Sequence, residues 1–314
     1  MKEKVLIIGC GYIGSALAVP LRAQGYSVCG LTRNAAQATH LAGAGVRVLA
    51  EDFWSGATFA PPIEPPDIVI NLLSAGGEGL DGYARNYRDA QDRIRDWLST
   101  LPQPPSLYLF TSSTRVYHQD GDVWVRESDA PDHLPDPGGD LLREGEKRIE
   151  HWPETICPRR VVLRLAGLYG PGRTFLLRQV LAGETFSRPS CHHFLNLLHR
   201  DDAASAIQAV VAGRERLREG YAVFSVADGQ PARKETILNW LGEQTQRPIQ
   251  WTDGEEKSGS RSPSSRSGRR PSRRMAIDAF REAFGWSPAY PDFRAGYGEL
   301  VQAQAQLSHL SAER

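Results

Sequence analysis

Short apolar runs alternate with segments of helical spacing over the first 170 residues. The runs predict strands at Val5–Ile8, Ser27–Leu31, Val46–Leu49, Asp67–Leu73, Leu107–Thr111 and Val161–Leu165, and the spacing predicts helices at Ile13–Gln24 and Tyr83–Leu98. In the first helix Ile13, Leu17 and Leu21 share one face, and Pro20 predicts a kink because proline removes a backbone hydrogen bond. Strands rich in Val, Ile and Leu with helices between them predict an α/β fold, a Rossmann-type doubly wound parallel sheet.

The pattern changes after residue 170. Tyr221–Val226 predicts one more strand near 221–228, Lys234–Gln244 predicts a helix, and a last amphipathic stretch runs through Leu300, Ala303, Leu307 and Leu310. We therefore expect residues 1–170 to form one domain and residues 171–314 mainly a smaller cap on the carboxyl edge of the sheet, where open α/β sheets bind ligands.

Two segments lie outside this alternation. Residues 257–274 hold Arg, Ser, Pro and Gly with no aliphatic or aromatic side chain to bury, which predicts a disordered loop. An RNA-binding or phosphorylated tract is the alternative, but no aromatic residues interleave with the arginines to support base stacking. The segment Asp120–Glu127 predicts a hairpin over the site, in which Trp124 either covers a ligand or is buried.

Composition narrows the class of protein. The 314 residues carry 37 Lys+Arg and 37 Asp+Glu, so charge alone predicts no nucleic-acid partner and no membrane surface. No apolar run is long enough for a transmembrane span. Four widely spaced cysteines form neither a disulfide framework nor a zinc motif, and we expect no metal. The apolar run Val5–Ile8 is too short for a secretory signal, and we expect a cytoplasmic protein.

A glycine motif gives the first chemical indication. Gly9-Cys10-Gly11-Tyr12-Ile13-Gly14 follows the first predicted strand and opens the first predicted helix. In Gly-x-Gly-x-x-Gly the first glycine permits a tight turn, the second lets the backbone approach a pyrophosphate, and the third lets the helix pack on the strand. The motif predicts a dinucleotide site, with phosphate oxygens on the N–H groups at the start of the helix.

The ends of the next strands predict which dinucleotide binds. An NAD site has an acidic residue after the second strand, whereas this chain has Thr32 and Arg33, and Arg33 can hold a 2′-phosphate. NADP is therefore favoured, with NAD possible. After the third strand Asp52 can bond the adenine amine and Phe53 follows it, and after the fourth strand Leu72, Leu73 and Ser74 would line the far half of the cofactor.

Several further motifs resemble one family along nearly the whole chain. They are Thr111-Ser112-Ser113-Thr114-Arg115-Val116-Tyr117, Leu163-Arg164-Leu165-Ala166-Gly167-Leu168-Tyr169-Gly170-Pro171-Gly172-Arg173, Asn196-Leu197-Leu198-His199-Arg200-Asp201-Asp202 and Phe284-Gly285-Trp286-Ser287-Pro288. Their order and spacing resemble the extended short-chain dehydrogenase/reductases, the NAD-dependent epimerase/dehydratase family, and its atypical YeeZ-like branch. The resemblance implies an oxidoreductase or epimerase-like protein, with Ser112 and Ala166 beside the cofactor and a small-molecule substrate such as a nucleotide sugar or another carbonyl or hydroxyl compound.

The resemblance also shows where this sequence departs from the family. The family uses a serine, which Ser113 matches, and a Tyr-x-x-x-Lys pair on the next helix. Between Tyr117 and Tyr169 the chain has no tyrosine, and its one lysine there, Lys147, has Arg143 four residues before it. A second register, which matches Glu146 to a family glutamate, puts Leu142 at the lysine position.

Three explanations of this departure stay open. Another group could replace the missing acid, with Tyr117, His118 and His199 as candidates; the enzyme could catalyse a different reaction; or the protein could bind NADP without turnover, as a sensor or scaffold. We expect Ser113, Tyr117 and Lys147 at the catalytic centre. The predicted substrate-binding residues are Arg164, Tyr169, Arg173 and His199, although Arg164 could equally pair inside the protein and His199 could simply position a helix capped by Asp202. By analogy with the family we expect a monomer or homodimer.

Overall fold

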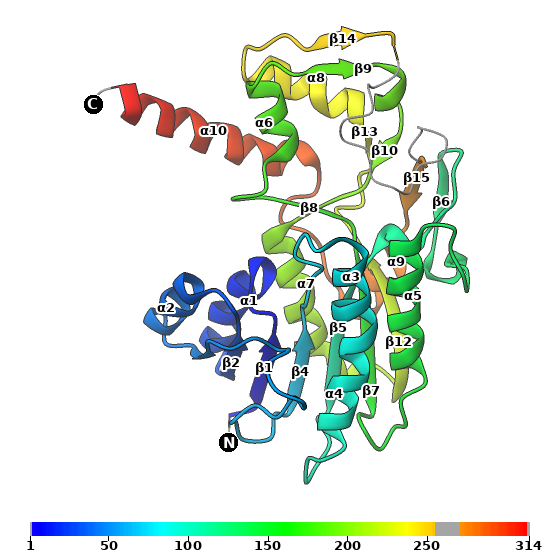
Figure 1. Ribbon diagram of the computed structural model, residues 1–314. Helices are drawn as coiled ribbons and strands as arrows, with labels where there is room; N and C mark the ends of the chain where they lie inside the picture. The colour runs from blue at the N-terminus through cyan, green and yellow to red at the C-terminus, as the bar shows by residue number, and fades with distance from the viewer. Residues whose placement is uncertain (1, 255–270, 313–314) are drawn as a thin grey trace.

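The computed structural model describes residues 2–254 and 271–312, with side chains as far as residue 306. Seven parallel strands form the central sheet in the order β3-β2-β1-β4-β5-β7-β12 (Figure 1). They are β1 (Lys4–Ile8), β2 (Ser27–Leu31), β3 (Arg47–Leu49), β4 (Ile68–Asn71), β5 (Leu107–Ser113), β7 (Arg159–Leu165) and β12 (Gly220–Val226). The predicted doubly wound α/β sheet is thereby confirmed.

Helices cover both faces of the sheet, and further helices lie beyond its carboxyl edge (Figure 1). In chain order the helices are α1 (Tyr12–Ala23), α2 (Ala35–Gly43), α3 (Gly79–Tyr83), α4 (Ala90–Leu98), α5 (Pro137–Glu150), α6 (Phe175–Leu181), α7 (Arg200–Gly213), α8 (Lys234–Gln244), α9 (Asp278–Phe284) and α10 (Phe293–Ala312). Helix α1 continues through Pro20. A π-helical turn, η1 (Ala84–Asp89), joins α3 to α4, and a 3₁₀ turn, η2 (Thr114–Val116), follows β5.

The core divides into two layers because side chains alternate across each strand. On β1, Val5 and Ile7 belong to the apolar cluster that holds the buried sides of α1, α7 and α9. Leu6 and Ile8 point the other way, into the cluster that includes Ile94 and Trp97 of α4 and Ile149 of α5. Burial on both faces explains the continuous apolar runs of the sequence.

A third apolar cluster lies beyond the carboxyl edge of the sheet, where α6, α8 and the start of α10 pack together (Figure 1). Short strand pairs lie outside the central sheet. They are β8 (Gly167–Tyr169) with β11 (Leu197–His199), β9 (Thr185–Ser187) with β14 (Gln250–Thr252), β10 (Phe194–Leu195) with β13 (Ala232–Arg233), and β6 (Val123–Val125) with β15 (Arg273–Met275).

Two local predictions need correction. The segment 120–127 forms no hairpin, because β6 pairs in parallel with β15. Trp124 is 51% exposed, so it is not buried, and it lies under the guanidinium of Arg274. The predicted loop at 257–274 falls mostly outside the described residues, but its last two residues, Arg273 and Arg274, belong to β15. Within the described part of the chain, no helix combines the length and apolarity that crossing a membrane requires.

Candidate functional site

One cavity of about 1250 Å³ runs along the carboxyl edge of the sheet. Its lining includes most residues predicted to bind the cofactor, namely Gly9, Gly11, Tyr12, Ile13, Thr32, Arg33, Asp52, Phe53, Leu72, Leu73, Ser74, Ser112 and Ala166. Ser113, Tyr117 and Arg173 also line it, whereas Gly14, Lys147, Arg164, Tyr169 and His199 are not among its lining residues. The structure thus brings the predicted cofactor residues together and separates them from most of the predicted catalytic and substrate residues.

The glycine turn is built as tightly as its motif requires. Gly9 has a φ of +83°, and a Cβ there would lie 2.9 Å from the backbone of Leu72 and Leu73 on the neighbouring β4 segment. A Cβ at Gly14 would lie 3.3 Å from Ile7, so this glycine lets α1 pack on β1. At Gly11, by contrast, the nearest atom to a Cβ is 4.0 Å away. The open side of the turn is therefore at Gly11, which lines the cavity.

The amino end of α1 is suited to an anion. Gly11 is its N-cap, no side chain caps the helix, and its first turn holds no acidic residue. The first N–H groups of a helix have no partner within the helix and carry the positive end of its dipole. Arg173 adds a cation nearby, because its guanidinium lies 4.5 Å from the centre of the Tyr12 ring. These groups together can hold a pyrophosphate.

The end of the cavity beside β2 holds the groups predicted to choose the cofactor. Arg33 is exposed, and its Nη1 lies 3.6 Å from Glu78 and 3.9 Å from Asp52, both longer than a direct hydrogen bond. Asp52 itself accepts a hydrogen bond from the backbone N–H of Trp54. The guanidinium of Arg33 is therefore only loosely held.

Ser113 and Arg115 lie at the inner end of the cavity, where β5 ends. The Ser113 hydroxyl accepts a hydrogen bond from the N–H of Arg115, at the start of η2. The Arg115 guanidinium binds both carboxylate oxygens of Asp136 and donates to the Tyr83 hydroxyl at 2.9 Å. These contacts fix a cation beside Ser113, and the hydrogen bond to Asp136 raises the pKa of Arg115 above its ordinary value.

Helix α5 carries both registers that the sequence allows for the family's Tyr-x-x-x-Lys pair. In the first, Lys147 donates to the carbonyl of Asp132 at 2.8 Å and pairs with its carboxylate at 3.1 Å, and neither residue is among those that line the cavity. In the second, Leu142 is buried in the core, and four residues earlier stands Gly138. A Cβ at Gly138 would lie 2.6 Å from the Cζ atom of Arg115, so this guanidinium occupies the space beside the glycine.

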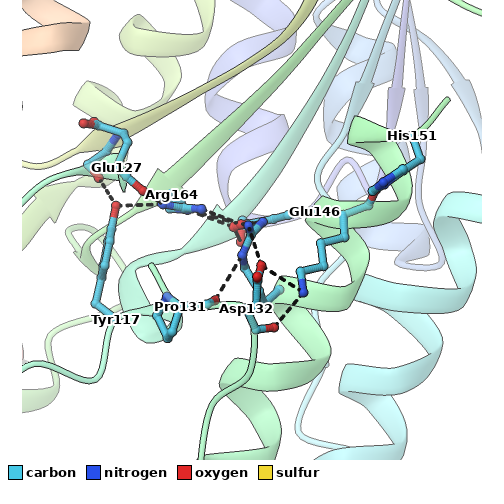
Figure 2. Close-up of polar contacts among 11 residues, drawn as sticks. Tyr117, Glu127, Pro131, Asp132, Glu146, His151 and Arg164 are labelled. Atoms are coloured by element: carbon cyan, nitrogen blue, oxygen red, sulfur yellow. Dashed lines mark hydrogen bonds and ion pairs between the residues drawn. The ribbon is translucent and has the colours of Figure 1, made fainter. Parts of the chain in front are cut away.

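Tyr117, which lines the cavity, forms a buried network with Arg164 and Glu146 (Figure 2). Arg164 bonds both oxygens of Glu146, with Nη2 2.7 Å from Oε2, and donates to the Tyr117 hydroxyl at 3.0 Å. That hydroxyl also lies 2.7 Å from Ser225, and Ser112 donates to Glu146 at 2.6 Å. Arg164 is therefore engaged in structural pairing rather than aimed at a substrate. Burial raises the pKa of Tyr117, and its hydroxyl is hydrogen-bonded to Arg164 and to Ser225.

Tyr169 and His199 lie in another buried cluster, outside the cavity. The Tyr169 ring stacks on Tyr297 with centroids 4.8 Å apart, and the His199 ring lies 3.8 Å from that of Tyr290. His199 is itself the N-cap of α7, because its Nδ1 accepts the N–H of Asp201. Asp202 caps nothing there and instead accepts two N–H groups of the 289–290 turn. Burial lowers the pKa of His199, which favours the neutral acceptor.

Asp228, in the same cluster, gives stability a dependence on pH. Burial raises its pKa from 3.8 to about 7, so between these values the folded protein binds a proton that the unfolded chain releases. This contribution to stability is present below about pH 4 and is lost as pH rises through about 7. Asp228→Asn should therefore raise the melting temperature relative to wild type at pH 8 but not at pH 4. Thermal unfolding at both pH values checks this, and an equal difference at both would contradict it.

Several cavity residues could not be found from the sequence. Arg85, Asn86 and Tyr87 reach the cavity from η1, because a π-turn rotates residues away from the regular helical spacing. Lys234 starts α8, and Arg273 lies within the tract predicted to be a loop. The sequence has no signal for the π-turn. Lys234 is predicted only as part of a helix and Arg273 only as part of a charged tract, so neither is predicted to line the cavity.

Comparison with known proteins decides the family. The NAD dependent epimerase/dehydratase family matches residues 5–223. The chain belongs to this family. Protein YeeZ of Escherichia coli K12 is 30% identical over 237 residues, which cover 74% of this chain and 80% of YeeZ. The family resemblance of the sequence motifs is thereby confirmed.

Two further family comparisons span nearly the whole chain. A 3-diazoavenalumate denitrifying reductase of Streptomyces is 25% identical over an alignment of 325 positions, covering 94% of this chain and 99% of the reductase. The structure of UDP-glucuronic acid 4-epimerase from Bacillus cereus, in complex with UDP-glucuronic acid and NAD, superposes with a TM-score of 0.76 at 17% identity, covering 97% and 99% of the two chains. At that identity the likeness establishes the fold.

Proposed function

We propose that the protein is an NADP-dependent oxidoreductase that reduces a small molecule in the sheet-edge cavity. The observation that carries this proposal is the continuity of one cavity from Arg33, past the uncapped amino end of α1 at Gly11, to Ser113. The cofactor's pyrophosphate would lie on α1, its adenosine end at Arg33 and its nicotinamide end near Ser113. NADPH supplies a hydride when bound there.

The preference for NADP over NAD rests on the end of β2. Thr32 and Arg33 stand where an NAD site has an acidic residue, and the contacts of Arg33 to Glu78 and Asp52 are long enough for a phosphate to compete with them. A guanidinium binds phosphate through two parallel N–H bonds, so Arg33 can recognise the 2′-phosphate specifically.

Reduction fits the chain's own residues better than epimerisation. Epimerisation through the family's route needs a phenol that takes and returns a proton, and in both registers of α5 that position is filled by Arg143 or Gly138. Arg115, fixed by Asp136 beside Ser113, keeps its proton and can stabilise negative charge that develops on the substrate. Ser113 would orient the substrate oxygen. The Streptomyces relative is likewise named a reductase.

Arg33→Ala tests the cofactor assignment. Loss of a charge-assisted pair to the 2′-phosphate should weaken NADP binding by roughly 10- to 100-fold and NAD binding by less than about twofold. Calorimetric titration of both nucleotides measures this difference. Arg47→Ala is the matched control, because Arg47 bonds the carbonyl of Pro62 outside the cavity. Equal losses for the two nucleotides would contradict a 2′-phosphate contact.

An activity assay distinguishes an enzyme from a protein that binds NADP without turnover. Stopped-flow or steady-state assays follow NADPH absorbance with carbonyl compounds and nucleotide sugars as substrates. Turnover that falls in Ser113→Ala while NADP affinity is kept supports the oxidoreductase. Tight NADP binding with no oxidation of NADPH by any of these compounds favours the sensor or scaffold.

A further inference from the structure

Arg273 is a cavity cation that forms no close ion pair with a carboxylate in the described part of the chain. It starts β15, lines the cavity, and is partly buried. Its Nη1 and Nη2 lie 3.4 Å from the carbonyl oxygens of Gln119 and Thr114, both at the long limit of a hydrogen bond. No ion pair joins it to any residue in the described ranges 2–254 and 271–312. A guanidinium has five N–H donors, and the described residues accept from only two of its nitrogens.

The charges of two carboxylates, Asp120 and Asp136, act on Arg273, but both carboxylates accept hydrogen bonds from other groups. One carboxylate oxygen of Asp120 accepts the N–H of Ser272 at 2.7 Å and that of Gly121 at 2.8 Å. Asp136 is bound by Arg115 and by the N–H of Gly139. Removing a charge from water is costly, and burial lowers the pKa of Arg273 even though the charges of Asp120 and Asp136 oppose that shift. An anion entering the cavity would remove this cost.

The place of Arg273 indicates how large such a substrate can be. Its guanidinium contacts the carbonyl of Thr114, the residue directly after Ser113. An anionic group on Arg273 therefore lies close to the hydroxyl proposed to orient the reacting atom. In a nucleotide sugar the diphosphate is separated from the reacting carbons by much of the sugar ring, so its charge falls elsewhere. A compact acid places its charge where Arg273 is.

We propose that the substrate is a small organic carboxylate, bound through both carboxylate oxygens by Arg273, with its reducible group within a few bonds of that carboxylate. This inference rests on the proposed function, because it places the substrate beside the proposed nicotinamide end. The planar guanidinium fork matches a carboxylate in geometry as well as in charge. Arg273 is thereby a specificity-determining residue.

The test uses matched pairs of acids and esters. Pyruvate, phenylglyoxylate and 4-formylbenzoate, each beside its methyl ester, are titrated calorimetrically into NADP⁺-saturated full-length protein. At least one acid should bind, about 10-fold or more tightly than its ester, and Arg273→Gln should remove that advantage. Arg273→Lys should restore only part of it, because lysine keeps the charge but not the fork.

Arg274→Gln is the control variant. Arg274 is the next residue of β15, but it contacts the Trp124 and Phe194 rings and the carbonyl of Asp122 and does not line the cavity. It should leave acid binding unchanged. If no acid binds better than its ester, or if Arg273→Gln and Arg274→Gln behave alike, the proposal is overturned. The same holds if Arg273→Gln instead weakens UDP or UDP-glucose, since the residue would then serve a diphosphate.

A titration of NADP⁺ and NAD⁺ into each variant separates this inference from the proposed function. Wild type and Arg273→Gln should bind NADP⁺ equally well. Nucleotide binding without acid recognition overturns the carboxylate substrate alone, whereas absence of nucleotide binding in the wild type overturns the proposed function. Equal melting temperatures of the two variants show that Arg273→Gln is folded.

Discussion

Replacing Gly11 with alanine is expected to weaken NADP binding by about 100-fold or more while leaving the protein folded. A Cβ at Gly11 meets no protein atom closer than 4.0 Å, so the folded chain tolerates it. The same methyl group would project into the cavity at the amino end of α1, where the pyrophosphate must approach the backbone. Calorimetric titration gives the affinity, and thermal unfolding of the cofactor-free protein gives the stability.

Two other glycine variants bracket this result. Gly9→Ala should destabilise the fold as well, because its Cβ would lie 2.9 Å from the Leu72 and Leu73 backbone at a positive φ. Gly43 lies in α2, and a Cβ there would have no neighbouring atom within 4 Å, so Gly43→Ala should change neither the NADP affinity nor the fold. Wild-type affinity in Gly11→Ala would mean that no phosphate lies against this turn.

Replacing Arg164 with methionine is expected to lower the free energy of unfolding by about 3–5 kcal/mol. The substitution removes the cation that bonds both oxygens of Glu146, which is 0% exposed, and it removes a donor from the Tyr117 hydroxyl. Glu146 keeps only the longer contact to Arg143 at 3.3 Å and the hydrogen bond from Ser112, so the loss should fall near the lower end of this range. Urea denaturation at pH 7 measures the change. Because Arg164 is not among the cavity-lining residues, NADP affinity of the folded variant should stay within about twofold of wild type.

A double variant tests the physical cause. In Arg164→Met with Glu146→Leu neither charge remains buried, so much of the lost stability should return. If Arg164→Met alone costs less than about 1 kcal/mol, or if the double variant is as unstable as the sum of the single variants, the buried pair is not what holds β7 to α5.

The sequence predicted the sheet and its cofactor edge because both depend on local signals. Buried parallel strands are continuous apolar runs, and a Gly-x-Gly-x-x-Gly turn is read within six residues. Parallel strands align their carboxyl ends at one edge, so the sequence alone predicts that Arg33, Leu72 and Ser113 lie at one site, and all three line the cavity.

The residues beyond the cofactor depended on distant partners that the sequence does not reveal. Arg164 is paired by Glu146, 18 residues away, and contacts Tyr117 at a separation of 47, so its choice between substrate and core could not be made from its own segment. Lys147 is predicted at the catalytic centre because it is the one lysine between Tyr117 and Tyr169, but its ammonium pairs with Asp132. Arg273 lay in a tract whose composition predicts disorder, and pairing with β6 gives it a fixed place.

The most direct test of the central claim is calorimetric titration of NADP⁺ and NAD⁺ into cofactor-stripped wild-type protein at fixed salt. The account predicts one site per chain that binds both nucleotides, NADP⁺ about 10-fold or more tightly, with that preference lost in Arg33→Ala. Absence of binding heat with either nucleotide would contradict it.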